Sequence, residues 1–163
     1  MIPFLALSAV VNPFVAANLG ASRPERVREA MRLLQRFSLA WGAALALALW
    51  WLAPWIAARF SDDPRVVEVI GRYLVIVPIS YGGAGILMIT NAAFNGLGRP
   101  MAATAISALR MFVVNVPVAW LGARLLGVPG VFLGIALANA LVGAIAGGWM
   151  RQATRALVAS RAP

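Results

Sequence analysis

Long apolar runs separated by short polar segments dominate the sequence. A membrane-spanning helix needs about 20 mostly apolar residues, because each residue adds ~1.5 Å across a hydrocarbon core of ~30 Å. Five runs meet this requirement, and the segments between them are too short to form a soluble domain. The predicted spans are 2–19, 33–58, 73–97, 101–123 and 128–150. The sequence therefore predicts an all-α protein, a polytopic transmembrane helix bundle that forms a single membrane domain over residues 1–163.

The segments between the spans contain signals for turns and helix starts. Residues 21–36 have the sequence ASRPERVREAMRLLQR. Here Ser22 is a candidate N-cap and Pro24 suits the first turn, so a short amphipathic helix should run into the second span. Residues 60–65 (FSDDPR) predict a turn followed by a helix start. Residues 96–100 (GLGRP) predict a tight turn between antiparallel helices.

Composition supports a membrane environment and excludes several classes of function. Of the residues, 62% are hydrophobic, whereas soluble domains average about 45–50% even with glycine included. The chain has no Cys and no His, which excludes thiolate or imidazole metal sites and nucleophilic triads. All five acids lie between the apolar runs, so the spans offer almost nothing for acid–base catalysis. We therefore expect no enzyme activity, no cofactor and no metal site.

The basic residues are all Arg, and the net charge is +9. No soluble basic domain is present to bind nucleic acid, so the expected partner of these residues is the lipid bilayer. If the helices alternate, one side holds the Arg residues of segment 21–36, Arg99, Arg151, Arg155 and Arg161, nine in all. The other side holds four, at positions 59, 65, 72 and 124. The positive-inside rule then places the C-terminus in the cytoplasm.

Polar side chains within the third span form one candidate site. Tyr81, Met88, Asn91 and Asn95 are spaced so that they fall near one face of a helix. An amide in hydrocarbon must find a partner or water. This face therefore either lines a substrate cavity or forms interhelical hydrogen bonds that hold the bundle together. The residues alone leave both interpretations open.

Arg110 is a second candidate. It lies nine residues into the fourth span, which is ~14 Å at ~1.5 Å per residue and close to the midplane of a ~30 Å core. A charge at this depth is unfavourable and must face protein or water. No acid of the chain lies at a similar depth, so its partner is expected to be backbone carbonyls, water or residues outside this sequence. Arg110 either serves function or fixes the packing of helices.

The third and fourth spans contain backbone breakers. Pro78 and Pro117 lie inside the third and fourth spans, and several glycines follow Pro78. Proline removes a helical hydrogen bond and bends the helix, and transporters use interrupted helices at binding sites and hinges. We therefore expect the third and fourth spans to be interrupted.

Four segments together resemble the multidrug and toxin extrusion (MATE) transporters. They are AANLGASRPERVREA (16–30), FSDDPRVVEVIGRYLVIVPISY (60–81), NAAFNGLGRP (91–100) and ALRMFVVNVPVAWLG (108–122). Their order and spacing are similar to those of the family's C-terminal lobe. The resemblance implies helices eight to twelve of a plan of twelve, with the eighth incomplete and the N-terminal lobe missing.

The resemblance also implies a function. Members of this family are secondary-active antiporters of the cell membrane, here a bacterial inner membrane, that export small organic, often cationic compounds as H⁺ or Na⁺ enters. The acid that couples protons in the N-terminal lobe is missing here, and the Tyr81–Asn95 face lacks the acid of some Na⁺-coupled members. H⁺ coupling through the missing N-terminal lobe is therefore expected, and the chain alone should be inactive. The alternatives are a small membrane scaffold without transport and a related flippase of lipid-linked substrates.

Overall fold

The computed structural model describes residues 1–160 as helices joined by short turns. The elements are α1 (Ile2–Gly20), α2 (Pro24–Phe60), α3 (Pro64–Ile76), the 3₁₀ turn η1 (Val77–Ser80), α4 (Tyr81–Gly96), α5 (Pro100–Ala108), the π-helical turn η2 (Leu109–Asn115), α6 (Val116–Leu126) and α7 (Val128–Ala159). No strand occurs among these residues, so the all-α prediction is confirmed. Arg161, counted above with the C-terminal tail, lies outside the described residues.

Five continuous helical stretches are long and apolar enough to cross a membrane. They are Ile2–Gly20, Pro24–Phe60, Pro64–Gly96, Pro100–Leu126 and Val128–Ala159, and each corresponds to one predicted span. Two of them extend well past the predicted boundaries, because α2 already begins at Pro24 and α7 continues to Ala159. The amphipathic segment before the second span is therefore the first part of one long helix.

In the turn between α1 and α2, the residue expected to cap α2 has a different role. The N-cap of α2 is Arg23, not Ser22, and no side chain caps this end. Ser22 instead closes α1 with a φ of 59°. The N–H groups of Ser22 and Arg23 donate to the carbonyls of Leu19 and Asn18. These two bonds around a left-handed residue form a Schellman motif, after which Pro24 begins α2 at a position where its missing N–H leaves nothing unsatisfied.

The turn between α4 and α5 has the same construction. Gly98 has a φ of 70°, and the N–H groups of Gly98 and Arg99 donate to the carbonyls of Asn95 and Phe94. An Arg-Pro pair again starts the next helix. Glycine adopts a left-handed φ without steric penalty, so the sequence signals this turn clearly. A serine in the same role gives no such signal.

The third and fourth spans are interrupted near their internal prolines, as predicted, whereas Pro13 in α1 and Pro54 in α2 lie inside unbroken α-helices. The 3₁₀ turn η1 contains Pro78 and separates α3 from α4. The π-helical turn η2 ends just before Pro117, which lies in the first turn of α6. Proline cannot donate its helical hydrogen bond and its ring crowds the preceding turn. The tighter 3₁₀ turn and the wider π turn accommodate the missing hydrogen bond and the proline ring. Turns of the π type are frequent at functional sites.

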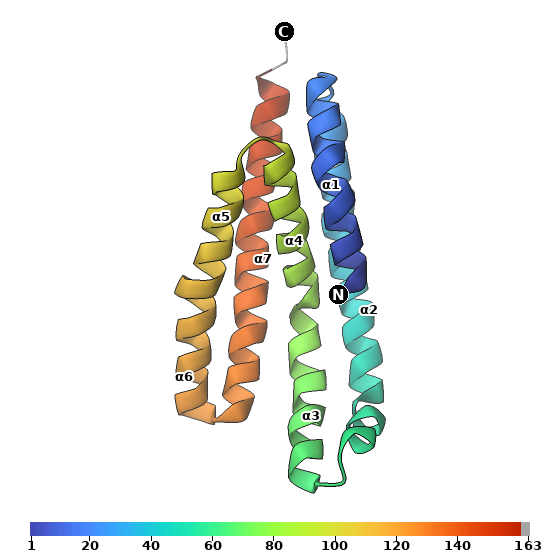
Figure 1. The fold of residues 1–163 in the computed structure, drawn as a ribbon, viewed down its shortest axis with the longest axis vertical. Coiled ribbons are helices and arrows are strands. Elements are labelled where there is room, and N and C mark those ends of the chain that lie inside the picture. Colours follow the sequence, from blue (N-terminus) through green and yellow to red (C-terminus); the bar gives the residue numbers. More distant parts are fainter. Residues whose placement is uncertain (161–163) are drawn as a thin grey trace.

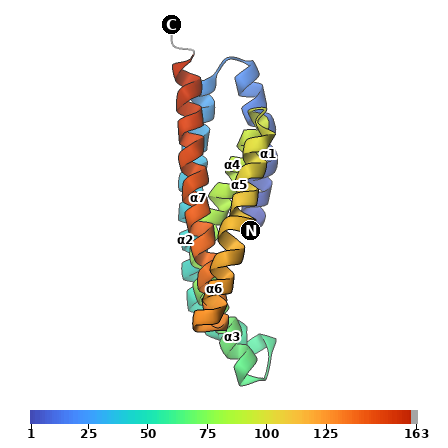
Figure 2. The same ribbon diagram turned by 90° about the vertical axis from the view of Figure 1, so that its left-hand side faces the viewer.

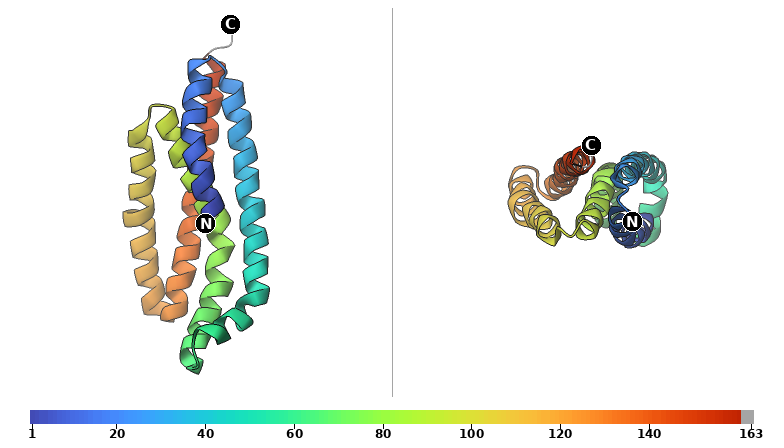
Figure 3. Two further views of the ribbon diagram at one scale, coloured as in Figure 1. Left: turned by 45° about the vertical axis from the view of Figure 1, so that its right-hand side comes forward. Right: turned by 90° about the horizontal axis from the view of Figure 1, so that it is seen from above.

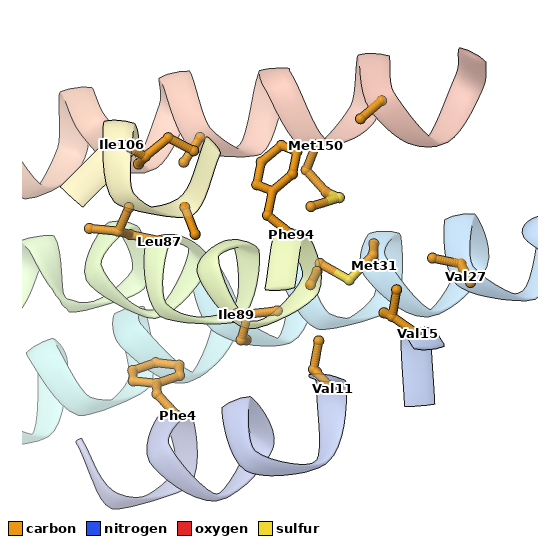
Figure 4. Close-up of a cluster of buried hydrophobic side chains, with 14 of the residues drawn as sticks. Phe4, Val11, Val15, Val27, Met31, Leu87, Ile89, Phe94, Ile106 and Met150 are labelled. Atoms are coloured by element: carbon orange, nitrogen blue, oxygen red, sulfur yellow. The ribbon is translucent and has the colours of Figure 1, made fainter. Parts of the chain in front are cut away.

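Helix α4 is the central helix of the bundle. Helices α1, α2, α5 and α7 all pack against it, whereas α6 packs on α7. Figure 3 shows this arrangement from above. Buried apolar side chains from α1, α2, α4, α5 and α7 meet in one cluster (Figure 4). Its fully buried members include Phe4, Ile89, Phe94, Ile106 and Met150.

The Arg-rich connections lie together at one end of the bundle. Figures 1 and 2 show the α1–α2 turn, the α4–α5 turn and the C-terminal end of α7 at this end, which we call the Arg-rich end. The α2–α3 and α6–α7 connections lie at the opposite end. There Arg59 lies 5.4 Å above the ring of Trp55, and Arg124 lies 4.1 Å above the ring of Trp120. Exposed tryptophans with cationic neighbours are typical of a membrane interface.

Candidate functional site

Three of the predicted site residues line one groove between α1 and α4. The groove is open, has a volume of about 390 Å³, and is lined by Ser8, Ala9 and Asn12 of α1 and by Met88, Asn91, Ala92 and Asn95 of α4. Tyr81, predicted for the same face, is not among the lining residues. It is half-buried at the very start of α4, two helical turns before Met88.

The polar lining of the groove is neutral. Asn12, Asn91 and Asn95 bring three carboxamides, each with donors and an acceptor. The Nδ2 of Asn91 donates to the Oγ of Ser107 on α5 at 2.9 Å. Its Oδ1 is buried without a partner among residues 1–160. A buried acceptor without a partner costs about 1–3 kcal/mol, so Asn91 favours a hydrogen-bond donor brought in by a bound molecule.

Arg110 is bound through neutral polar groups that cross three spans. Its Nη2 donates to the Oδ1 of Asn139 on α7 at 3.0 Å. The Nδ2 of Asn139 donates to the Oγ of Ser80 at 3.1 Å, and that hydroxyl donates to the carbonyl of Val77 at 2.8 Å. Asn139 and Ser80 are 4% and 3% exposed. The expectation of a partner among carbonyls, water or residues outside the sequence is therefore corrected, because the partner is the Asn139 amide.

This network leaves the positive charge of Arg110 without a counter-ion. An amide oxygen satisfies one N–H group but carries no net charge, and the Nε of Arg110 is buried without a partner in the described part of the chain. Within residues 1–160 the one ion pair joins Glu68 and Arg72 on α3. No group of three or more metal-ligating side chains gathers among these residues either. A half-buried cation without a counter-ion attracts an anion.

Ser107 lies between the groove and Arg110 along the fourth span. Its hydroxyl accepts the hydrogen bond from Asn91, and it lies about one helical turn before Arg110, which belongs to the π-helical turn η2. Arg110 is not among the groove-lining residues. The candidate site therefore consists of an amide-lined groove and, about one helical turn beyond Ser107 along the fourth span, the half-buried Arg110.

Five polar residues of this site were not predicted from the sequence, among them Ser107 of α5. Ser8 and Asn12 lie in the first span, Ser80 lies in η1, and Asn139 lies in α7. Asn139 did carry a signal, because it is the one amide in the apolar run 128–150. A lone amide in hydrocarbon needs a partner, and Arg110 was the one charged group at a similar depth. Because each of these two groups needs a polar partner at this depth, the contact between Arg110 and Asn139 could have been predicted.

Known proteins resemble this chain over most of its length. The MatE family model matches residues 1–121. A FAD transporter from Shewanella oneidensis is 36% identical over 143 residues, which cover 88% of this chain and 32% of that protein. The chain thus spans about a third of the length of this relative.

Solved structures agree. The MATE transporter VcmN from Vibrio cholerae, in its bent form, superimposes with a TM-score of 0.90 at 32% identity, over 94% of this chain and 35% of the other. An outward-facing multidrug resistance MATE transporter of the MOP superfamily has a TM-score of 0.88 at 21% identity, over 96% of this chain and 36% of that one. The latter likeness shows the fold alone. From the family match and these relatives, the chain belongs to the MATE family, whose members are membrane transporters and not enzymes.

Proposed function

We propose that this chain forms part of a secondary-active exporter of organic compounds, and that the groove between α1 and α4 contributes to the substrate pathway. Purely interhelical hydrogen bonds would leave the amides paired, yet Asn95 is exposed and the Oδ1 of Asn91 is buried without a partner in the described chain. Neutral donors and acceptors in an open groove suit a substrate that must bind and leave.

The substrate we propose carries anionic groups. The observation that carries this choice is the charge of Arg110, which has an amide rather than a carboxylate as its partner. Guanidinium groups match phosphate oxygens in geometry and charge. The Shewanella relative is named a FAD transporter. FAD contains a charged pyrophosphate and ring systems with hydrogen-bonding edges, which guanidinium and carboxamide groups can bind.

A second candidate is the export of cationic compounds, as the resemblance to multidrug transporters implied. One similar structure is that of a multidrug resistance transporter. An unneutralised guanidinium near the pathway disfavours a cation, however, and the groove lining contains no carboxylate to attract one. The spans also contain no acid to carry a coupling ion. Coupling, which we expect to use H⁺, would therefore depend on residues outside this chain.

The test joins this chain to the rest of a full-length relative. Residues 1–163 would replace the C-terminal third of the Shewanella FAD transporter, and cells would be assayed for FAD in the medium and for retention of a cationic dye. At matched membrane abundance we expect FAD export, reduced at least about tenfold by Arg110→Gln, as the loss of a charge-assisted hydrogen bond predicts. Arg124→Gln serves as the control. Dye export that depends on the groove amides, without FAD export, would favour the cationic candidate.

We also propose that the Arg-rich end faces the cytoplasm, which the positive-inside rule supports. The chain has no Cys, so single cysteines at Ser22, Ser61 and Ser160 would each report one position. In whole cells an impermeant thiol reagent should label Ser61→Cys and spare the other two. Labelling of Ser22→Cys with protection of Ser61→Cys would invert the orientation.

A further inference from the structure

A second, larger groove runs between α2 and α7 on the opposite face of α4. Its volume is about 820 Å³. From α4 and η1 it is lined by Ile79, Gly82, Gly83 and Ile86, which lie about half a helical turn away from Met88, Asn91 and Asn95. Apart from Gln35 and Arg151 at one end, the lining is Leu, Ile, Ala and Gly. The groove is therefore apolar along its length and polar at one end.

The groove has the length of one lipid leaflet. Along α2 its lining runs from Gln35 to Leu47, and along α7 from Ala140 to Arg151. At ~1.5 Å per residue these distances are ~18 Å and ~17 Å. Half of a ~30 Å hydrocarbon core is ~15 Å. The groove thus reaches from the Arg-rich end to about the middle of the membrane, as one acyl chain does.

Arginines surround the polar end of the groove. An adjoining pocket of about 210 Å³ is lined by Arg32, Gln35, Arg36, Arg151 and Arg155, and a smaller one next to it also includes Arg28. The acids on this part of α2 are Glu25 and Glu29, and no carboxylate lies within ion-pair distance of these arginines in the described chain. Five guanidinium groups against two carboxylates leave a strongly positive end.

Gln35 joins the arginine pocket to the apolar groove. It is 2% exposed, its Oε1 accepts from the Nε of Arg151 at 2.8 Å, and its Nε2 donates to the carbonyl of Gly147 at 3.3 Å. This holds Arg151 at the junction of the two spaces, since both include Gln35 and Arg151. The bond uses the Nε of Arg151, so its two terminal nitrogens remain for an anionic acceptor.

We propose that this composite site binds an anionic phospholipid, with the phosphate among Arg32, Arg36, Arg151 and Arg155 and one acyl chain along the groove between α2 and α7. A soluble anion would use the arginine pocket alone, and a neutral lipid would use the groove alone. A phospholipid with net negative charge uses both, and basic pockets between membrane helices commonly hold such headgroups. The inference is independent of the transported substrate, because it involves the other face of α4.

The test measures which lipids the purified chain retains. The chain would be reconstituted into vesicles of equal parts phosphatidylglycerol and phosphatidylcholine with identical acyl chains, extracted in detergent, and analysed by native mass spectrometry. We expect phosphatidylglycerol to be retained in preference. The double variant Arg151→Gln/Arg155→Gln should lower this preference about tenfold, given the contribution of each basic residue near a membrane surface. Arg59→Gln/Arg65→Gln, at the opposite end, is the matched control and should retain the preference.

A groove variant separates lipid binding from simple anion binding. A side chain added at Gly148, which lines the groove, would meet nothing within 4 Å, and the same holds for Gly71 on α3. Gly148→Leu should therefore fill the groove without disturbing the fold and lower phosphatidylglycerol retention severalfold, whereas Gly71→Leu should not. Equal retention of both lipids by the wild type would overturn the proposal. So would full retention by Gly148→Leu, or complete displacement of the lipid by inorganic phosphate.

Discussion

The third and fourth membrane-spanning stretches, Pro64–Gly96 and Pro100–Leu126, have similar mean hydropathies of 1.7 and 1.5 but very different surroundings. In the third, 56% of the most apolar window is buried by the rest of the chain, and in the fourth 11%. The third stretch contains α4, and the fourth contains α6 at the edge of the bundle. Hydropathy identifies both as membrane helices and does not distinguish the central helix from the peripheral one.

The difference lies in the number of neighbouring helices, and glycines let α4 approach several of them closely. Gly83, Gly85 and Gly96 of α4 lie where an added Cβ would collide with α7 or α1, and at Gly82 it would be tightly packed against α2. At Gly83 it would lie 2.5 Å from the carbonyl oxygen of Asn139 on α7. Small residues let membrane helices approach this closely, and packing contacts replace the hydrophobic drive that is missing in lipid. In α6 the one glycine, Gly122, lies equally close to Gly130 of α7, but α6 packs mainly on this one helix.

The largest effect should follow from enlarging Gly83. Gly83→Leu forces apart α4 and α7, and overpacking of this kind costs about 1–3 kcal/mol or more. We expect the monodisperse folded protein to be lost on heating in detergent. Size-exclusion chromatography of the heated sample measures this loss. Gly71→Leu is the control, since its Cβ would meet nothing within 4 Å. Equal heat resistance of the two variants would show that α4 is not tightly packed.

A smaller effect should follow from removing the partner of Arg110. Asn139→Ala leaves the half-buried guanidinium of Arg110 and the buried hydroxyl of Ser80 with fewer hydrogen bonds, which should cost about 1–3 kcal/mol of stability. The measurement is the melting temperature of the purified chain. Asn18→Ala is the control, because it removes a half-buried amide on α1 whose side chain bonds only within its own helix, to the carbonyl of Phe14, and it should change stability less. If both variants melt at the same temperature, the network from Arg110 to Val77 does not stabilise the bundle.

The smallest effect is expected on α6. Arg124→Gln removes the cation–π contact with Trp120, which is worth about 0.5–1 kcal/mol at an exposed site. Its melting temperature should therefore fall less than that of Asn139→Ala. A larger fall would mean that the peripheral helix contributes more to stability than its exposure indicates.

The sequence predicted the parts of this fold that depend on local chemistry. Apolar run lengths gave the five spans, Gly98 and Pro100 gave the α4–α5 turn, and Pro78 and Pro117 gave the two interruptions. Ser22 shows the limit of such rules. It has the composition of an N-cap, yet its left-handed backbone closes the preceding helix.

The candidate site depended on which helices meet, and this is a property of tertiary packing. The spacing of Met88, Asn91 and Asn95 identified their shared face, because helical periodicity is local. It could not show that Asn12 lies across from them, or that Tyr81 lies outside the groove. The depth of Arg110 in the membrane could likewise be predicted from its position in the fourth span. Its contact with Asn139, however, depends on the approach of α7 to η2.

The role of the α1–α4 groove can be tested by comparing the thiol reactivity of cysteines that replace two methionines. Met88 lines the groove, and Met111 is 58% exposed on the fourth span, also far from either end of its helical stretch. In a cysteine-free fusion with the rest of the Shewanella relative, Met88→Cys should react with an impermeant thiol reagent, and FAD should slow the reaction. Met111→Cys should stay unreactive, because we expect this exposed apolar face to lie in lipid. Equal lack of reaction at both positions, or reaction at Met88→Cys that FAD leaves unchanged, would contradict the placement of the substrate pathway in this groove.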